Sequence, residues 1–298
     1  MAWTLTGSLD EFEAAAGEHL RTDPVRQTVP LTLLATLRER GLAAFGDAPP
    51  VYGWHRSAGQ VDGAFLQTPP YPVLVASLPD ESALSLISLL SEDGRDLSAV
   101  NLPGPAEPAF LGAWAAATGG SAATRQRSRL FRLGALAAPD PMPSGAARVA
   151  GSADRDVLIS WHEAFSREVE RGAHGPADRM VDDRLSYGGL MLWEADGRPA
   201  AMAGITRLVA GVARVAPVYT PPGNRRRGFG GAVTTAVSQA AIDAGAAEVV
   251  LYTDLANPTS NALYQRLGYR PVEERVLLDL LPASRDQANV TGTRRAPS

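Results

Sequence analysis

The residues with the clearest chemical potential lie in one short turn, Asn224 to Gly231, which combines three arginines with three glycines. A helix is expected to begin at this turn, and the first backbone N–H groups of a helix have no partner within it. These N–H groups and the positive end of the helix dipole attract anions if no side chain blocks them. Guanidinium groups suit phosphate oxygens. We therefore predict a diphosphate site; the alternative is a glycine-rich loop with a solvated arginine cluster. The residues concerned are Arg225, Arg226, Arg227, Gly228, Gly230 and Gly231.

Two widespread phosphate-binding motifs do not fit this turn. The dinucleotide motif G-x-G-x-x-G needs a third glycine three residues after Gly230, where the chain has Val233. A P-loop needs a lysine after its second glycine, and the chain contains no lysine. The turn therefore favours neither a nicotinamide nucleotide nor a P-loop nucleotide.

A strand and a helix are predicted on the two sides of the turn. The run from Val212 to Thr220 alternates and is rich in β-branched residues, which is typical of a strand, and Pro221 and Pro222 end it. From Phe229 onward apolar residues recur at helical spacing until Gly245 provides a C-terminal stop. The order strand, turn, helix leaves the start of the helix open.

A second set of polar residues is predicted to share one face of a short helix. Asn257 is a good N-cap residue, Pro258 suits the first helical position and Gly268 ends the helix. Asn257, Asn261 and Tyr264 are spaced at i, i+4 and i+7. This spacing places their side chains on the same side of the helix.

These two segments together resemble one known family. The order Arg225-x-x-Gly228-x-Gly230 after a strand resembles the acyl-CoA pyrophosphate loop of the GNAT acyltransferase superfamily. The segment from Asn257 to Tyr269 is similar throughout to the family's N-x-x-[AS]-x-x-L-Y-x-x-x-G-[YF] helix. The resemblance covers about residues 146–280. It implies a GNAT N-acetyltransferase domain that uses acetyl-CoA as its cosubstrate.

The resemblance also implies roles for individual residues. Backbone N–H groups of Val218 to Thr220 would lie along the pantetheine arm and near the acyl carbonyl, where Pro217 lacks an N–H and would open the strand pairing locally. Tyr264 would be the general acid that protonates the departing thiolate, through proximity rather than acidity. The alternative for Tyr264 is a half-buried aromatic residue with a satisfied hydroxyl. The implied cofactor-binding residues are Val218, Tyr219, Thr220, Arg225, Arg226, Arg227, Gly228, Phe229, Gly230, Gly231, Asn257 and Asn261.

The general base and the acceptor are left open. The strand from Val212 to Thr220 carries no carboxylate, although many relatives have a glutamate there, so the amine proton would leave through water or another residue. Glu168, Glu170, His162 and His174 lie near the acceptor pocket of this superfamily, but each alone is typical of a solvated surface group. The acceptor is an amine of a small molecule, an amino acid or a peptide N-terminus. The likeness of paired domains to the glycine N-acyltransferase-like branch favours a small acceptor.

The predicted elements follow the same order twice along the chain: helix, helix, strands, helix, strand, helix, strand. We therefore predict an α/β fold with a mixed sheet, built from two tandem GNAT-like domains. The first half has Asp80 and Glu81 at the corresponding helix start, where they would repel a diphosphate. The N-terminal domain is therefore expected to be degenerate and to stabilise or shape the acceptor site. The predicted segments are the degenerate domain at 1–137, a proline-rich linker at 138–145, the catalytic domain at 146–282 and a flexible tail at 283–298.

Composition limits the other classes of function. The chain has 298 residues, 45% of them hydrophobic and 20% charged, which is ordinary for a protein with a folded core. A net charge of −4 argues against nucleic-acid binding. The absence of cysteine and the scattered histidines predict no metal site. No targeting signal or membrane-spanning run is evident, so we expect a cytoplasmic protein without a membrane partner; a homodimer stays open.

Three functions compete on this evidence. The first is an N-acetyltransferase that moves an acetyl group directly from acetyl-CoA to a primary amine. The second is a transferase that uses a longer acyl-CoA, and the third is a non-enzymatic acyl-CoA-binding module. The intact loop and Tyr264 favour catalysis over binding alone.

Overall fold

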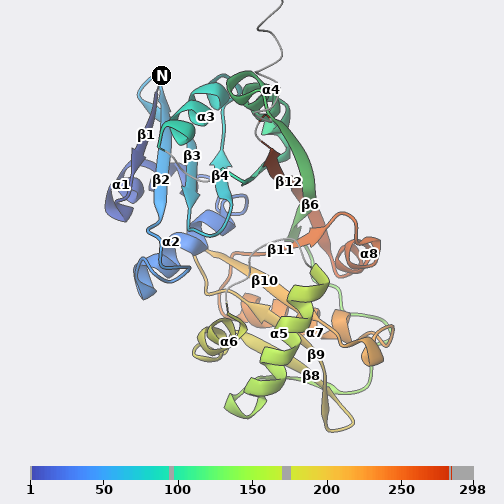
Figure 1. Cartoon of the computed structure of the whole chain (residues 1–298). Helices are drawn as coiled ribbons and strands as arrows, with labels where there is room; N and C mark the ends of the chain where they lie inside the picture. Colours follow the sequence, from blue (N-terminus) through green and yellow to red (C-terminus); the bar gives the residue numbers. More distant parts are fainter. Residues whose placement is uncertain (1, 94–96, 170–175, 282, 284–298) are drawn as a thin grey trace, which may run out of the picture.

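A computed structural model describes residues 2–93, 97–169, 176–281 and 283. Its strands form one mixed sheet of 12 strands, flanked by helices (Figure 1). The predicted α/β class with a mixed sheet is confirmed. The helices and strands of the first half are β1 (Ala2–Thr6), α1 (Leu9–Arg21), α2 (Thr28–Arg40), β2 (Val51–Ser57), β3 (Gln60–Gln67), β4 (Val73–Ser77), α3 (Ala83–Glu92), β5 (Ala99–Pro103), α4 (Glu107–Thr118) and β6 (Ser121–Leu133). Those of the second half are β7 (Ala146–Val149), α5 (Arg155–Val169), α6 (Ala177–Leu185), β8 (Leu190–Ala195), β9 (Arg198–Ile205), β10 (Val212–Tyr219), α7 (Phe229–Asp243), β11 (Glu248–Asp254), α8 (Pro258–Arg266) and β12 (Tyr269–Leu281).

The strand order confirms the predicted duplication. The order is β1-β2-β3-β4-β5-β12-β6-β11-β10-β9-β8-β7. If each strand of the first half is matched to the strand six numbers later, the order reads the same from either end. The two halves therefore share one topology, as expected for tandem domains.

The last strands of the two halves are exchanged. β6 ends the first half but pairs with β11 and β12 of the second half. β12 ends the second half but pairs with β5 of the first half as well as with β6. Each half therefore receives its final strand from the other, and the sheet is continuous across the molecule. The boundary at 138–145 stays a proposal.

One strand was not expected from the sequence. Ala2–Thr6 forms β1, which pairs antiparallel with β2 at the edge of the sheet. The side chain of Trp3 is buried, and its indole N–H donates to the Ser82 carbonyl oxygen at 3.1 Å. The strand pairing and the burial of Trp3 come from residues distant in the sequence, which is why the short local pattern gave no signal. The predicted tail is 283–298, of which residues 284–298 lie outside the described residues.

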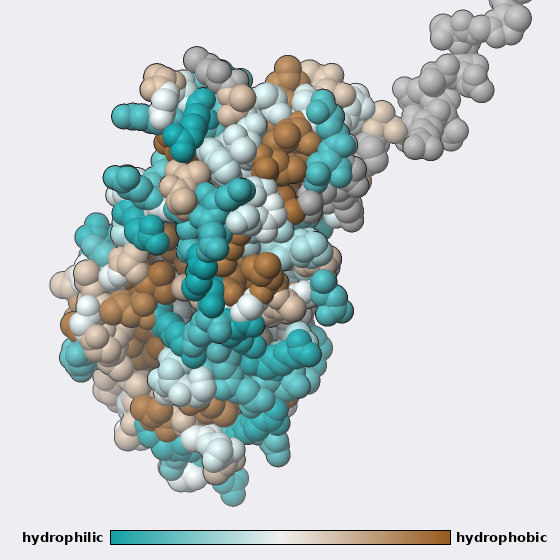
Figure 2. All heavy atoms as spheres, turned by 90° about the vertical axis from the view of Figure 1, so that its left-hand side faces the viewer, coloured by the Kyte–Doolittle hydropathy of each residue, from teal (hydrophilic) through white to brown (hydrophobic). Residues whose placement is uncertain are grey.

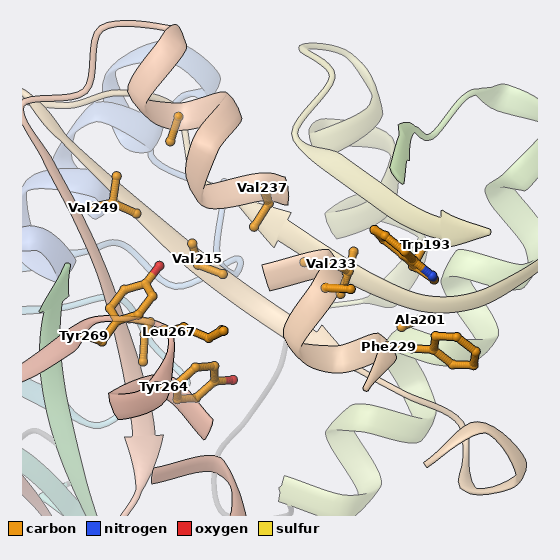
Figure 3. Packing of buried hydrophobic residues seen from close by; sticks show 14 of the residues in the cluster. Trp193, Ala201, Val215, Phe229, Val233, Val237, Val249, Tyr264, Leu267 and Tyr269 are labelled. Atoms are coloured by element: carbon orange, nitrogen blue, oxygen red, sulfur yellow. The ribbon is translucent and has the colours of Figure 1, made fainter. Parts of the chain in front are cut away.

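Helices α7 and α8 cover one face of the C-terminal half of the sheet. Phe229 and Val233 of α7 pack in one buried cluster with Val215 of β10. Tyr264 of α8 and Leu267, which directly follows α8, belong to the same cluster (Figure 3). Helices α5 and α6 pack on the other face in a separate cluster. The start of α7 is therefore held in place by a buried aromatic residue at its first position.

Strands β10 and β11 separate partway along their length. They pair in parallel from Val212 with Glu248 to Val215 with Leu251, and the pairing ends there. β10 continues beside β9 through a bulge, because Ala216 and Pro217 lie between the pairs Val215–Ile205 and Val218–Ala203. The predicted opening of the strand at Pro217 is confirmed, since proline cannot donate to a ladder.

Figure 2 shows one face of the molecule, on which hydrophilic residues lie between hydrophobic patches. Ion pairs join α2 of the first half to residues of the second half. Arg207 contacts Glu39 of α2 at 3.1 Å and Asp183 of α6 at 3.0 Å. Arg40 of α2 lies 3.7 Å from Asp183. α2 and α6 are therefore neighbours. No helix among the described residues is long and apolar enough to cross a bilayer.

Candidate functional site

The start of α7 offers unpaired backbone N–H groups. Gly228 is the N-cap, in the left-handed conformation with φ 83°. Within residues 2–93, 97–169, 176–281 and 283, the N–H groups of residues 228–231 donate to no acceptor, and the first bond of the helix is Ala232 N–H to Gly228 O at 3.1 Å. A Cβ at Gly230 would lie 3.2 Å from Thr220 Oγ1. The glycines therefore keep the first turn narrow and its donors accessible to an anion.

The three arginines of the turn are not equivalent. Arg225 binds Glu168 of α5, with its Nη2 at 2.6 and 2.7 Å from the two carboxylate oxygens, and its Nε donates to Thr220 O at 3.0 Å. Arg227 lies over the ring of Phe229, 4.7 Å from the centroid. Arg226 is exposed and has a positive φ of 61°. Arg226 and Arg227 form no ion pair among the described residues. Their guanidinium groups are therefore available to bind a diphosphate.

The exposed edge of β10 begins where β11 leaves it. From Ala216 onward β10 pairs only with β9, through Val218 with Ala203 and Tyr219 with Met202. The ring of Tyr219 faces α5, with its centroid 6.2 Å from that of Trp161. The backbone edge turned away from β9 at residues 216–220 therefore offers hydrogen-bonding groups to an extended ligand.

Helix α8 lies against β11 and β12, and its Leu263 lies near Gly231 at the start of α7. Asn257 caps the helix by accepting from Ser260 N–H at 3.0 Å. Asn261 Nδ2 donates to the carbonyl oxygens of Asp254 and Asn257 at 2.9 and 2.7 Å. Its Oδ1 is buried and has no hydrogen-bond partner among the described residues. A buried acceptor without a donor costs free energy, so this oxygen is suited to an amide N–H of a ligand.

Tyr264 has a free hydroxyl in a buried position. Its side chain is 8% exposed, and its ring meets that of Tyr269 edge-on at 6.0 Å (Figure 3). The hydroxyl of Tyr269 bonds Ser238 Oγ at 2.6 Å, whereas none of the described residues bonds the Tyr264 hydroxyl. Burial, and to a smaller degree Tyr269, raises the pKa of Tyr264 above its ordinary value. Tyr264 therefore keeps its proton at neutral pH, and its hydroxyl is available to a ligand.

The predicted linker runs along the start of α7. A Cβ at Gly231 would lie 3.3 Å from Pro139 Cγ, and one at Gly228 would lie 3.5 Å from Pro143 Cγ. The carbonyl oxygen of Ser144 accepts from Trp193 Nε1–H at 3.0 Å. The linker therefore packs against the Cα side of the two glycines and ties this turn to β8.

Gly204 is a site residue that sequence reasoning missed. It lies on β9 opposite the bulge, and a Cβ there would be 2.6 Å from Ala216 O, 2.7 Å from Arg184 Nη1 and 3.0 Å from Pro217 Cδ. The signal that points to it is the pair of small residues Ala203 and Gly204 on a strand that lies beside a proline-containing strand. Gly204 makes room for the bulge at which β10 and β11 part.

Replacing Gly204 by alanine will destabilise the protein. The added methyl group forces the Ala216 carbonyl or the Arg184 side chain to move, so we expect the free energy of unfolding to fall by about 1–3 kcal/mol. Urea denaturation measures this difference. Gly112→Ala is the matched control, because a Cβ in α4 meets no atom within 4 Å there. This control is expected to be neutral or stabilising by about 0.4–1 kcal/mol. Equal stability of the two variants would contradict the role of Gly204.

Comparisons with known proteins agree with this geometry. Residues 156–269 match the model of the acetyltransferase (GNAT) family. No curated protein matches the chain. A GCN5-related N-acetyltransferase from Sphaerobacter thermophilus superposes with a TM-score of 0.65 at 16% identity, over 94% of this chain and 96% of that one. A GNAT-family acetyltransferase from Colwellia psychrerythraea gives 0.59 at 14%, over 94% and 100%. A tandem GNAT protein from the clavulanic acid biosynthesis pathway gives 0.56 at 14%, over 95% and 99%. At these identities the structural likeness concerns the fold.

Proposed function

Because residues 156–269 form a domain of the GNAT acetyltransferase family, whose members transfer acyl groups from acyl-CoA, we propose that this chain moves an acetyl group from acetyl-CoA to a primary amine by direct transfer. The amine belongs to a small molecule, an amino acid or a peptide. The observation that supports the proposal most is the start of α7, where the N–H groups of residues 228–231 have no acceptor among the described residues and lie beside Arg226 and Arg227.

In this proposal, acetyl-CoA extends from the start of α7 along β10. The first turn of α7, with Arg226 and Arg227, would hold the diphosphate. The edge of β10 that is turned away from β9 at residues 216–219 would bind the amide groups of the pantetheine arm. Asn261 Oδ1, buried without a donor, would accept from one of its N–H groups. Arg225 would reach the diphosphate only by leaving Glu168, so its contribution is expected to be smaller.

The chain's own residues would then serve the transfer. Acetyl-CoA supplies the acetyl group as a thioester, the new bond joins the amine nitrogen to the acyl carbon, and the carbon–sulfur bond breaks. Backbone N–H groups near Val218 would stabilise the negative charge that develops on the acyl oxygen. Tyr264 would donate its proton to the departing thiolate, because its hydroxyl is protonated at neutral pH and unpaired among the described residues. The amine proton leaves to water or to a base that we do not assign.

A binding panel followed by a turnover assay tests the proposal. CoA and acetyl-CoA should raise the melting temperature, since a ligand that binds only the folded state stabilises it, whereas NAD and ATP should not. Longer acyl-CoAs in the same panel establish the chain length. Release of free thiol from acetyl-CoA should then depend on an added amine. Binding without amine-dependent thiol release would indicate a binding module, and absence of CoA binding would end the assignment.

A further inference from the structure

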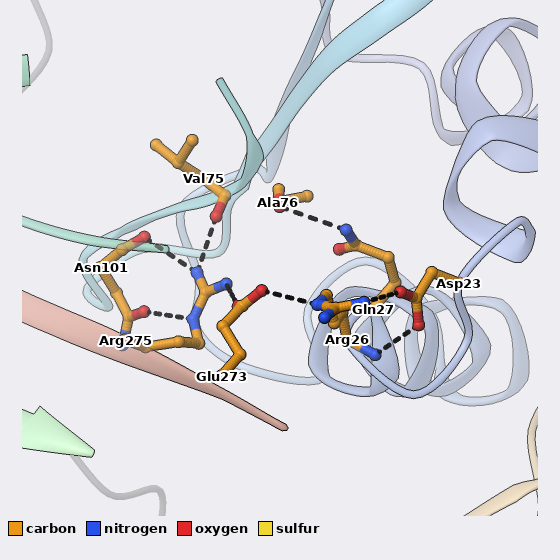
Figure 4. A network of polar contacts seen from close by, with 8 residues as sticks. All are labelled: Asp23, Arg26, Gln27, Val75, Ala76, Asn101, Glu273 and Arg275. Atoms are coloured by element: carbon orange, nitrogen blue, oxygen red, sulfur yellow. Dashed lines mark hydrogen bonds and ion pairs between the residues drawn. The ribbon is translucent and has the colours of Figure 1, made fainter. Parts of the chain in front are cut away.

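Arg184 and Arg275 are buried and Arg214 is half-buried. Of these three arginines, Arg275 has hydrogen-bond partners and a nearby carboxylate. Arg275 of β12 donates from Nε to Asn101 Oδ1 at 2.9 Å and from Nη2 to Val75 O at 2.7 Å, and its Nη1 lies 3.8 Å from Glu273 (Figure 4). Glu273 also contacts Arg26 at 3.1 Å. This network shows how the fold pairs a buried guanidinium when it serves structure.

Arg184 of α6 has no such partners. Its side chain is 8% exposed, and its Nη1 is buried without a hydrogen-bond partner among the described residues. The adjacent carboxylate of Asp183 is turned to Arg207 and Arg40 instead. Burial lowers the pKa of Arg184 from its ordinary value. Burying a guanidinium without a carboxylate partner costs desolvation free energy, so buried charges in proteins are usually paired.

Arg214 of β10 is the second uncompensated charge. It is half-buried on the face opposite α7, and among the described residues its side chain donates one hydrogen bond, from Nη1 to Thr28 Oγ1 of α2 at 3.4 Å. Burial lowers the pKa of Arg214 to about 10, and the nearby guanidinium of Arg184 adds to this effect. Arg214 therefore still carries its charge at neutral pH. In the part of the chain that the structure describes, neither Arg184 nor Arg214 takes part in an ion pair.

This pair of arginines lies beside the bulge at which the transfer is proposed. Arg184 Nη1 and Ala216 O both lie within 3 Å of one point, the Cβ position that Gly204 leaves empty. The hydroxyl of Tyr252, on β11 near Arg214, is also buried without a partner among the described residues. Positive charge and free polar groups therefore converge on the α2 and α6 side of the sheet, away from α7.

We propose that the acceptor amine carries a carboxylate group and that Arg184 and Arg214 bind this carboxylate; this inference rests on the proposed acetyl transfer. Two guanidiniums suit a carboxylate because each offers parallel N–H donors. The short path from Arg184 to the bulge favours a compact acceptor, in which few bonds separate the amine from the carboxylate. The substrate class is therefore a free amino acid rather than a peptide N-terminus, whose carboxylate is remote.

Matched acceptors with and without the carboxylate test this inference. Glycine and β-alanine are compared with their amides, at equal concentrations of unprotonated amine, by thiol release from acetyl-CoA. The kcat/KM of the wild type should be at least about 10-fold higher for the amino acids than for their amides. An amide has no carboxylate, so the buried guanidinium stays unpaired when the amide binds. Phosphoethanolamine and ethanolamine form a second pair. If the enzyme preferred phosphoethanolamine to glycine, the proposal of a carboxylate-binding site would be wrong, and the arginines would bind a phosphate instead.

Charge variants locate the preference. Arg214→Gln and Arg184→Gln should raise KM for the amino acids by about 10-fold to 100-fold, with little change for the amides or in KM for acetyl-CoA. Arg214→Lys should retain part of the preference because it keeps the charge. Arg132→Gln is the control: it removes one arginine that pairs with Glu248 at the exposed surface of β6 and should leave all acceptors unchanged. Unchanged acetyl-CoA binding shows that each variant is folded.

Calorimetry separates this inference from the proposed function. Glycine is titrated into the wild type and Arg214→Gln, each saturated with CoA, and should bind only the wild type. Equal use of amino acids and amides, or equal binding of glycine to both proteins, would overturn the carboxylate site and leave the acetyltransferase intact. Failure to bind CoA would instead remove the proposed function.

Discussion

The Tyr264→Phe variant will turn over about 10²-fold more slowly than the wild type and will bind CoA with the same affinity. The hydroxyl is protonated at neutral pH, because burial raises the pKa of Tyr264, and no described residue accepts its hydrogen bond. It is therefore free to donate to a thiolate that forms only during the reaction. Steady-state kinetics with saturating amine gives kcat, and calorimetry gives the dissociation constant for CoA.

Tyr269→Phe is the matched control for this prediction. The two rings contact each other edge-on, but the hydroxyl of Tyr269 already bonds Ser238 Oγ. Its removal should lower the free energy of unfolding by about 0.5–1.5 kcal/mol and leave turnover near that of the wild type. If Tyr264→Phe kept the wild-type kcat, Tyr264 would have no part in the chemistry and its buried ring would serve packing alone.

The Gly230→Asp variant will lose CoA affinity by about 10²-fold to 10³-fold, since a fixed carboxylate a few ångströms from a bound diphosphate costs several kcal/mol at an intermediate dielectric. Gly230 lies in the first turn of α7, where the N–H groups have no acceptor among the described residues. The new carboxylate would also accept from these donors itself. Titration calorimetry with CoA at fixed ionic strength measures the loss.

Two further variants separate charge from size and from position. Gly230→Ala adds only a Cβ that lies 3.2 Å from Thr220 Oγ1 and should cost much less affinity. Gly223→Asp adds the same charge just before this turn, at a point where a Cβ meets no atom within 4 Å and six residues before α7 begins. Affinity that falls equally in both aspartate variants would mean that the turn acts through net charge rather than through the donors of α7.

The candidate site shows what short-range sequence patterns could predict. Pro217 was expected to open the strand, and the bulge lies at Ala216 and Pro217. Asn257 was expected to cap α8, and it accepts from Ser260 N–H. Gly228 was expected at the start of α7, and it is the left-handed N-cap. Each of these outcomes depends on the conformational limits of one residue and a few neighbours, which the sequence displays directly.

The partners of the charged side chains could not be read in the same way. Arg225 was predicted to bind diphosphate together with Arg226 and Arg227. In the structure, Arg225 forms an ion pair with Glu168 of α5. Nothing in the sequence indicated that Arg184 and Arg214 are special, because a single arginine in a strand or helix is usually exposed to solvent. Only the packing of α2 and α6 on the sheet buries them together.

The sequence by itself therefore determined most of the local elements, their repeated order and the glycine-rich start of α7, because turns, caps and periodicity are properties of consecutive residues. The tertiary structure alone decided the exchange of β6 and β12, the addition of β1 at the edge and the meeting of Arg184 with Arg214. These features depend on contacts between residues far apart in the chain. Their free energy comes from burial and pairing that no local pattern records.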